Sequence, residues 1–477
     1  MKLTHVQQLF FLKGMLWLAA AGAGVFPLRA EAAGQLPQPA DSLPQRWAYT
    51  EHFNQTVPTE DRWWRSFNDP TLDTLMAMGV ENNYNVLMAA RRMEIARQTL
   101  NRVRSQYFPT ITFDGGWTKS RTSGAMISPH ADASTESYFS LGFNMNWQID
   151  VFGKIASQAK AKKSMWQASR AQYAATMVTL CGNIASAYFQ LRTYQAREAV
   201  AVEHIASQER IVKITEARKE CGLAQGLDVA QARTVLYSTK ASLPLLDTSI
   251  RSAINLLSVL TAVPANELYG LLGTARPMPD YIQLVRTGVP MDLLRRRPDI
   301  VAAEHELASY AADLGVAKKD FLPTLSLNGS IGTAAHNAGD LFRSNSFTYT
   351  IAPTLTWTLF SGLSRSYALN EARENMQIGI DNYNLMVMTA LKEVDDAMTS
   401  YTNTFRQINL LKDVVDESTR ELELSVDLYK SGLSGFTNVA DAQLTLLSYA
   451  DNLVAARGNA LQALVNIYEA LGGGWEP

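Results

Sequence analysis

This 477-residue chain has few histidines and no excess of charge of either sign. The six histidines are scattered, and none forms a helical pair with the spacing of a metal site. No other constellation of catalytic residues is present, so we expect no enzyme activity, no cofactor and no metal. The formal net charge is −2, which offers no basic patch to a nucleic acid.

Cysteine is also scarce, with only Cys181 and Cys221 present. They are 40 residues apart on one predicted helical arm. At 1.5 Å per residue this separation is about 60 Å, which excludes a disulfide between them within the chain. Cys181 falls in an apolar stripe and is expected in a core. No cysteine stands directly after the N-terminal segment, so a lipid anchor attached through cysteine is not expected.

The N-terminal segment, residues 1–32, has the pattern of a secretory signal. Lys2 and Lys13 flank it, a short apolar stretch follows over residues 14–26, and Ala30-Glu31-Ala32 offers a cleavage site. A spanning helix needs about 20 apolar residues, and neither this stretch nor any later one supplies them. An exported chain that still contacts lipid would do so through strands, which points to a bacterial outer membrane.

Four segments alternate apolar and polar residues with the period of a two-faced β-strand. They are centred on residues 110–118, 138–151, 325–331 and 347–359. In the second, Phe139, Leu141 and Phe143 alternate with Ser140 and Asn144. A tilted strand crosses a bilayer in about 9–11 residues, so lipid on one face and water on the other would explain the pattern. Two half-buried hairpins in a soluble domain would explain the alternation equally well.

The chain repeats itself at an offset of 210 residues, as the pair 221–232 and 431–442 shows. A long heptad pattern predicts a helical hairpin over 363–430 with 439–471, and the repeat predicts its twin over 154–220 with 227–262. Two further helices are predicted, from Asp69-Pro70 to about residue 106 and from Pro298 to before Phe321. The predicted organisation is signal 1–32, periplasmic connector 33–68, first repeat 69–264 (β-hairpin 108–151, tip 221–228), extended linker 265–290, second repeat 291–472 (β-hairpin 322–359, tip 431–438) and tail 473–477.

Four strands cannot close a membrane barrel, and open edges in lipid leave backbone groups unpaired. Two copies would give 8 strands with a filled interior, whereas three would give 12 with room for water. We therefore predict a mainly α protein with membrane β-structure, a homotrimer whose 12-stranded barrel continues into an α-helical coiled-coil tunnel.

Through several motifs that follow one another in order, the chain resembles the TolC-like outer membrane efflux proteins, in the branch that serves resistance-nodulation-division pumps. They are residues 63–70 (WWRSFNDP), 150–154 (DVFGK), 294–300 (LRRRPDI), 357–362 (WTLFSG) and 441–443 (DAQ). The resemblance covers the whole mature chain. It implies an outer-membrane channel with a periplasmic tunnel, exporting drugs or other small molecules with a periplasmic adaptor and an inner-membrane pump.

The resemblance also suggests where the functional residues lie. Asp441 occupies the position that faces the closed periplasmic aperture, where three copies would form a carboxylate ring. Thr437 stands where family members often have leucine, so the resemblance does not carry an apolar constriction to this level. Asp228 is a second candidate for the gate. Either aspartate could instead be an ordinary residue near a helix N-terminus.

The two predicted tips are the candidate adaptor-docking surface. Their glycines would permit tight turns between helices, and their leucines would form a small exposed patch. The candidate residues are Gly222, Leu223, Gly226, Gly432, Leu433 and Gly435. Two other functions stay open, an exit duct for secreted protein and a periplasmic coiled-coil scaffold. The exported compound cannot be identified because a wide watered lumen selects weakly.

Overall fold

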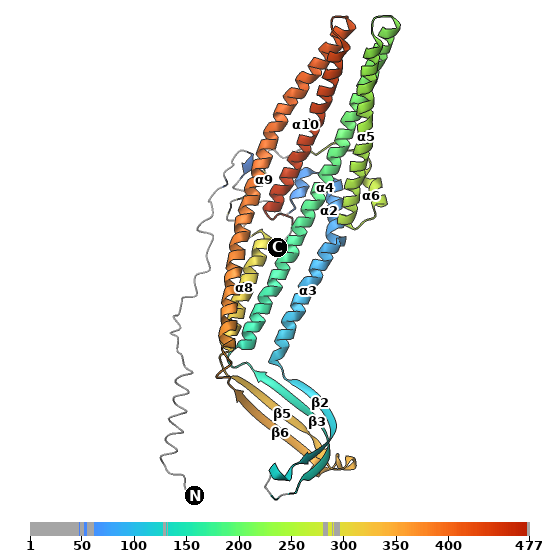
Figure 1. Cartoon of the computed structure of the whole chain (residues 1–477). Helices are drawn as coiled ribbons and strands as arrows, with labels where there is room; N and C mark the ends of the chain where they lie inside the picture. The colour runs from blue at the N-terminus through green and yellow to red at the C-terminus, as the bar shows by residue number, and fades with distance from the viewer. Residues whose placement is uncertain are drawn as a thin grey trace. The chain divides into compact units, whose positions relative to one another are not determined.

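The computed structural model describes residues 47, 52–54, 62–126, 130, 132–279, 285–288, 290 and 296–474. The predicted signal and most of the first connector lie outside these residues, as does part of the linker. Figure 1 shows the elements in chain order. They are β1 (Phe53–Asn54), α2 (Pro70–Asn82), α3 (Tyr84–Arg104), β2 (Thr110–Thr122), β3 (Ser134–Ile149), α4 (Lys154–Glu220), α5 (Gly226–Thr261), α6 (Ala265–Leu272), β4 (Val285–Arg286), α8 (Pro298–Lys319), β5 (Thr324–Ala335), β6 (Phe347–Thr356), α9 (Ser364–Lys430) and α10 (Phe436–Ala470).

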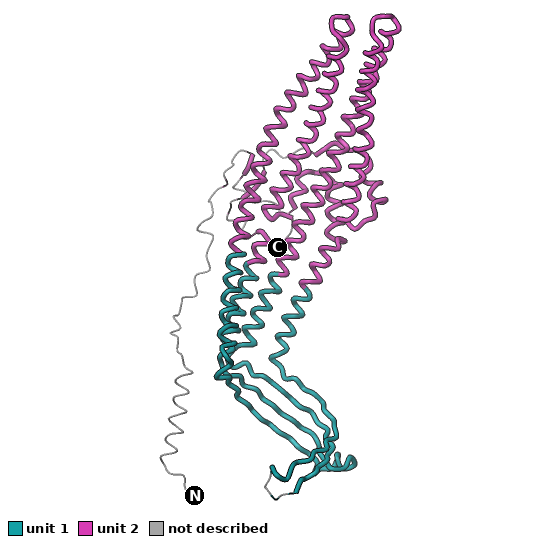
Figure 2. The backbone as a smooth tube through the Cα atoms, viewed as in Figure 1, with its two compact units in different colours: residues 1–38, 94–168, 304–382 teal, residues 39–93, 169–303, 383–477 magenta. Residues whose placement is uncertain are grey.

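The chain divides into two compact units, drawn in teal and magenta in Figure 2. Among the described residues, unit 1 falls within 94–168 and 304–382, and unit 2 within 39–93, 169–303 and 383–477. Each repeat contributes to both units, because the long helices α4 and α9 pass from one unit into the other.

Unit 1 contains one antiparallel sheet with the strand order β2-β3-β5-β6. The four strands are those expected from the alternation, and β3 of the first repeat pairs with β5 of the second. On one face, Phe113 lies beside Phe143 with ring centroids 5.3 Å apart. On the other face, Asn146 donates to Asn328 across the repeat boundary at 2.6 Å. The sheet therefore separates an apolar from a polar surface.

Matching tryptophans fix the helix-proximal end of each strand pair. Trp147 Nε1 donates to the Tyr107 carbonyl at 2.9 Å, and Trp357 Nε1 donates to the Phe321 carbonyl at 3.0 Å. Both acceptors stand two residues before a proline that precedes the strand. Tryptophan with an apolar body and a satisfied polar edge is typical of the ends of membrane strands.

Unit 2 is held together by a core of apolar side chains from helices of both repeats. Tyr188, Leu191, Val394 and Leu464 belong to it and are fully buried. Cys181 is in this core, as expected, and burial raises the pKa of its thiol to about 12, with a smaller contribution from Glu469. Cys221 is exposed, and both cysteines are free, which confirms that they do not pair.

A single helix was predicted from residue 70 to 106. This prediction is wrong, because the helix is interrupted at Asn83. This residue is extended, with ψ 125°, and separates α2 from α3. Its Oδ1 accepts the amides of Asn85 and Val86, which starts α3, while its Nδ2 donates to the Leu260 carbonyl near the end of α5 at 2.8 Å. The side chain thus joins the end of one helix to the start of another.

The second repeat makes the corresponding junction with Arg297. This buried guanidinium donates to the Ala470 carbonyl at the end of α10 (2.9 Å) and forms ion pairs with Asp299 in the first turn of α8 and with Glu393 of α9. Both ion pairs measure 2.7 Å. A cation near a helix C-terminus satisfies its last carbonyls and the helix dipole.

The linker is not wholly extended as predicted. Residues 265–272 form helix α6, which buries Leu268 and Leu272 against the core. Farther along, β4 pairs in parallel with β1 of the first connector. The proline and polar residues of this segment predicted an extended chain. The burial of Leu268 and Leu272 and the pairing of β4 with β1 stabilise regular structure instead.

The prediction that no later segment is apolar enough to span a membrane also needs correction. Helix α5 is long and apolar enough to cross a membrane, judged by length and composition. The core helix of a soluble protein can also meet this criterion of length and composition. Here Val235, Leu236 and Ile254 of α5 are buried in the cores of unit 2.

Candidate gate and docking surface at the helical tips

Each helical hairpin in unit 2 turns through the same hydrogen-bonded motif. At the end of α4, Leu223 N donates to the Arg218 carbonyl (2.8 Å) and Gly222 N to the Lys219 carbonyl (2.9 Å). At the end of α9 the pattern recurs with Leu433 and Gly432. Gly222 and Gly432 have φ of +73° and +76°, a left-handed conformation that a side chain would strain. The predicted tips are therefore two equivalent helix ends.

The other two tip glycines lie within the predicted tips, at the starts of the helices that follow the turns. Gly226 is the first residue of α5 and Gly435 precedes α10 with φ −74°. A Cβ atom added at either position meets nothing within 4 Å. The turns therefore require Gly222 and Gly432, and neither Gly226 nor Gly435.

Side chains from both hairpins meet beside the tips. Tyr429 Oη of α9 donates to Asp228 Oδ2 of α5 at 3.2 Å, and Arg218 Nη1 of α4 donates to the Lys430 carbonyl at 2.5 Å. The Arg218 guanidinium also lies 5.0 Å from the centre of the Tyr429 ring. Burial and the Asp228 carboxylate raise the pKa of Tyr429, so its hydroxyl stays a donor. We call Arg218, Asp228, Tyr429 and Lys430 the interhairpin contact.

An apolar cluster supports the interhairpin contact from inside. It combines residues of all four helices, including Ile211 of α4, Val235 of α5, Tyr429 of α9 and Phe436 of α10. Farther from the tips, Arg197 of α4 binds Asp451 of α10 through two hydrogen bonds of 2.7 and 2.8 Å. Separation of the hairpins at their tips would break the interhairpin contact and expose the cluster.

The predicted gate residues fall into two groups. Asp228 belongs to the interhairpin contact, whereas Asp441 and Thr437 lie one turn apart on an exposed stripe of α10. The buried face of the same helix carries Phe436, Val439 and Ala440. Within the described part of the chain, Asp441 has no hydrogen-bond or ion-pair partner. Its carboxylate is thus available to groups outside the chain.

The predicted docking leucines are exposed. Leu223 and Leu433 keep 66% and 78% of their surface accessible, although the turn motif usually gives this position an apolar contact. Two such leucines at equivalent positions form a pair of apolar points at the ends of the hairpins. An exposed apolar pair of this kind suits contact with another protein.

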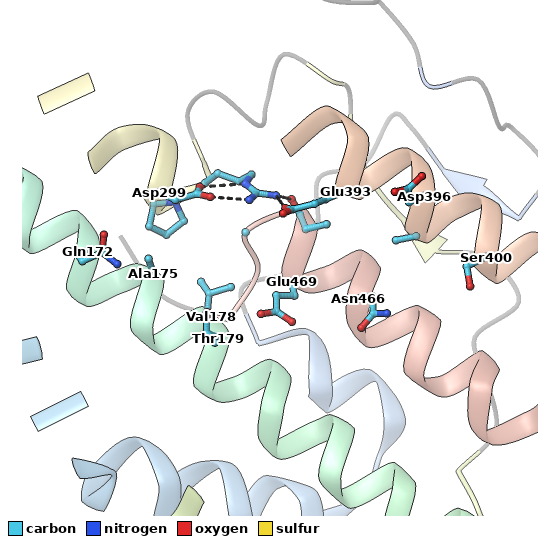
Figure 3. A pocket seen from close by; sticks show the side chains of 15 residues that line it. Gln172, Ala175, Val178, Thr179, Asp299, Glu393, Asp396, Ser400, Asn466 and Glu469 are labelled. Atoms are coloured by element: carbon cyan, nitrogen blue, oxygen red, sulfur yellow. Dashed lines mark hydrogen bonds and ion pairs between the residues drawn. The ribbon is translucent and has the colours of Figure 1, made fainter. Parts of the chain in front are cut away.

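A separate pocket of about 680 Å³, lined by both charged and apolar side chains, lies at the junction of α10 and α8 (Figure 3). Arg297, Glu393 and Glu469 line it, together with Thr179 of α4 and Asn466 of α10. Burial raises the pKa of Glu469; Glu393 adds to this effect and Arg297 opposes it. The described residues contain no group of three His, Cys, Asp or Glu side chains placed to hold a metal ion.

Sequence reasoning missed Arg218, Tyr429 and Lys430. All three stand in the last turn before a tip glycine, where a cation is favoured by the helix dipole. That position was a usable signal for Arg218. Lys430 takes part through its backbone carbonyl, which its residue type does not indicate. Which aspartate Tyr429 would reach depends on how the hairpins pack, and heptad spacing does not specify it.

Comparison with known proteins identifies the family of the chain. The family model described as "Outer membrane efflux protein" matches residues 77–263 and 289–473. The toluene efflux pump outer membrane protein TtgF of Pseudomonas putida is 29% identical over 432 residues, covering 90% of this chain and 88% of TtgF. The pyoverdine export outer membrane protein OpmQ of Pseudomonas aeruginosa is 26% identical, with 93% and 94% covered.

Solved structures share the fold. The outer-membrane channel OprN superposes with a TM-score of 0.85 at 28% identity, covering 91% of this chain and 98% of OprN. CusC, whose structures concern folding and transmembrane channel formation, gives a TM-score of 0.80 at 25% identity, with 91% and 97% covered. Both matches of the family model, one in each repeat, together span most of the sequence. The chain belongs to the outer membrane efflux protein family.

Proposed function

We propose that three copies of this chain form the outer-membrane exit duct of a tripartite efflux system. The observation that carries the proposal is the four-stranded sheet, which has one apolar face and two unpaired edges at β2 and β6. Edges in hydrocarbon must find partners, and cyclic pairing of copies supplies them. A periplasmic adaptor and an inner-membrane pump complete the system, and drugs or other small molecules are the substrate class.

The interhairpin contact and the Asp441 ring form the periplasmic gate in this proposal. Tyr429 and Asp228 hold the two hairpins of one chain together, and three Asp441 carboxylates attract cations while repelling one another. Opening would require the loss of the Tyr429–Asp228 hydrogen bond. Arg197 and Asp451 would keep the hairpins joined farther from the tip.

Single-channel conductance in a planar bilayer tests the duct and its gate. Wild-type trimers should show small, cation-favouring currents. Tyr429→Phe keeps the ring against Phe436 but removes the hydroxyl, and should raise conductance; Asp441→Ala should also raise it and weaken cation preference. Tyr449→Phe, on the same hairpin but outside the contact, is the matched control and should behave as wild type. Unchanged currents in both test variants would contradict this gate.

Leu223 and Leu433 form the adaptor-docking surface in this proposal. Replacing both by lysine places charges on the apolar pair and should abolish efflux of antibiotics from cells without lowering the yield of trimer. Replacing both by methionine keeps the apolar character and should preserve efflux. Preserved efflux in the lysine variant would rule out docking at the tips.

A further inference from the structure

The pocket at the junction of α10 and α8 has an excess of negative charge (Figure 3). Its acidic lining residues are Asp299, Glu393, Asp396 and Glu469. One guanidinium, that of Arg297, stands against them among the described lining residues, and it already forms ion pairs with Asp299 and Glu393. Asp396 forms an ion pair with Lys392, which does not line the pocket. The carboxylate of Glu469 is left without a matching cation.

Glu469 extends into the pocket between α4 and α10 (Figure 3). Within the described part of the chain, its half-buried carboxylate forms no hydrogen bond and no ion pair. Burial, and to a lesser degree Glu393, raises the pKa of this carboxyl, so its ionised form is disfavoured. A cation placed beside the carboxylate would offset that cost.

A glycine in α4 gives the Glu469 carboxylate its room. Gly182 lies in the interior of this long helix, where glycine is unfavourable for the helix itself. A Cβ atom at Gly182 would lie 2.7 Å from Glu469 Oε2 and 3.0 Å from its Cδ. The absence of a side chain at Gly182 therefore allows the carboxylate to lie directly against α4.

The first repeat has neutral residues at the corresponding places. Counting back 210 residues from Glu393, Asp396 and Glu469 gives Asn183, Ser186 and Val259. The two repeats share the helical hairpin and the helix junction, so the topology does not require carboxylates here. The acidic pocket is specific to the second repeat.

The size and the walls of the pocket indicate an organic cation. The described residues contain no group of three His, Cys, Asp or Glu side chains that could hold a metal ion, so the carboxylates do not converge on one small ion. A volume of about 680 Å³ is typical of sites for small organic molecules. Ala175, Val178 and Ala397 provide apolar wall, and the C-terminal end of α10 adds the negative end of a helix dipole.

The pocket opens on the face of α10 that carries Asp441. Asn466 lines the pocket and lies 25 residues after Asp441, which is about seven turns of 3.6 residues, and both side chains are exposed. If three Asp441 carboxylates surround the duct, the pocket opens into the same duct. This last step rests on the proposed function, whereas the binding of a cation by the pocket does not.

We propose that this pocket binds a protonated organic amine, with the ammonium group beside Glu469 and the apolar body against Ala175, Val178 and Ala397. The ammonium group supplies the hydrogen-bond donors that the carboxylate lacks, and the alanine and valine side chains contact the hydrocarbon part. In the duct, the pocket is an intermediate binding site for cationic compounds that pass along α10.

Isothermal titration calorimetry of detergent-purified trimers tests the site with 1-adamantylamine, which is cationic, and with 1-adamantanol, which is neutral and has nearly the same shape. All proteins carry Asp441→Ala, so that the aspartates near the tips bind no amine. This reference protein should bind up to one amine per chain, at least tenfold more tightly than the alcohol. Detergent without protein gives the blank for partition into micelles.

Two variants locate the amine within the pocket. Glu469→Gln removes the charge and should weaken amine binding about tenfold, the effect of one charge-assisted hydrogen bond. Gly182→Ala keeps every charge but displaces the carboxylate, and should weaken amine binding as well. Glu423→Gln, an exposed position on α9 outside the pocket, is the matched control and should leave amine binding unchanged.

The possible failures have distinct meanings. Absence of amine binding by the reference protein, or equal binding by it and both pocket variants, would overturn the site. Equal affinity for the amine and the alcohol would overturn its assignment to a cation. Displacement of the amine by magnesium chloride, but not by sodium chloride of the same ionic strength, would overturn its assignment to an organic ligand. None of these results changes the conductance of the duct, which tests the proposed function separately.

Discussion

The two repeats of this chain join their helices with different chemistry. In the first, the neutral Asn83 links the end of α5 to the start of α3. In the second, the buried Arg297 links α10 to α8 and brings two carboxylates with it. The neutral junction needs only hydrogen bonds, whereas the charged one needs its ion pairs to offset desolvation. Duplication preserved the topology and let the electrostatics of each junction diverge.

The tips differ in a similar way. Both turns use the same glycine motif, yet the interhairpin contact takes its guanidinium and carboxylate from the first hairpin and its phenol from the second. The residues 210 positions from Arg218 and Asp228 are Leu428 and Asn438, which cannot reproduce the contact. Each chain therefore has one such contact, and the two tips are not interchangeable.

The largest difference between the repeats is expected in how much each junction contributes to the free energy of unfolding. Arg297→Ala leaves Asp299 and Glu393 without their buried cation and should lower the free energy of unfolding by about 3–5 kcal/mol. Asn83→Ala removes a cap and should cost about 1–2 kcal/mol. Denaturant unfolding of the purified protein measures both. Similar losses would mean that charge adds nothing to the second junction.

A second comparison concerns buried polar residues near the tips. Gln208 of α4 is 2% exposed, and within the described part of the chain neither its Nε2 nor its Oε1 has a hydrogen-bond partner. The residue 210 positions later is Ser418 of α9, which is also buried and carries a single hydroxyl in place of the amide. Gln208→Leu should stabilise the hairpin packing by about 1–3 kcal/mol and lower channel conductance. Ser418→Ala should change neither property. A destabilised Gln208→Leu protein would show that the amide has a partner that the chain alone lacks.

The tip glycines should show smaller effects. Gly222→Ala and Gly432→Ala place a side chain at positive φ, and each should cost about 1–2 kcal/mol of stability. Gly226→Ala and Gly435→Ala meet open space and should be neutral or stabilise by about 0.5 kcal/mol. Thermal melting of the four variants measures this. Equal costs at all four positions would contradict the assignment of the turns to Gly222 and Gly432.

The smallest expected effect is a pH dependence confined to the second junction. Because the pKa of Glu469 is raised above its ordinary value of 4.5, its contribution to stability is present below pH 4.5 and is lost as the pH rises through the raised pKa. Glu469→Gln should melt about 2 °C higher than wild type at pH 7 and equally at pH 4. Glu423→Gln, an exposed position on α9, should show no such difference. A constant offset at both pH values would exclude titration of Glu469.

Local sequence patterns were sufficient for the main elements. The alternation of Phe139, Leu141 and Phe143 identified β3, the heptads identified α9 to within one residue, and the repeat identified α4. Gly222 and Gly432 followed from the repeat itself. The break at Asn83 was not predicted, because it depends on a carbonyl 177 residues away on α5.

The sequence by itself determined which segments are strands and helices, since periodicity of two or of 3.5 residues decides which face each element can bury. It also determined that one face of the sheet is apolar. Only the tertiary structure decided which residues meet, including Tyr429 with Asp228 and Arg297 with Glu393. The physical reason is that such contacts depend on how two elements are aligned with each other. The residue pattern within one element does not specify that alignment.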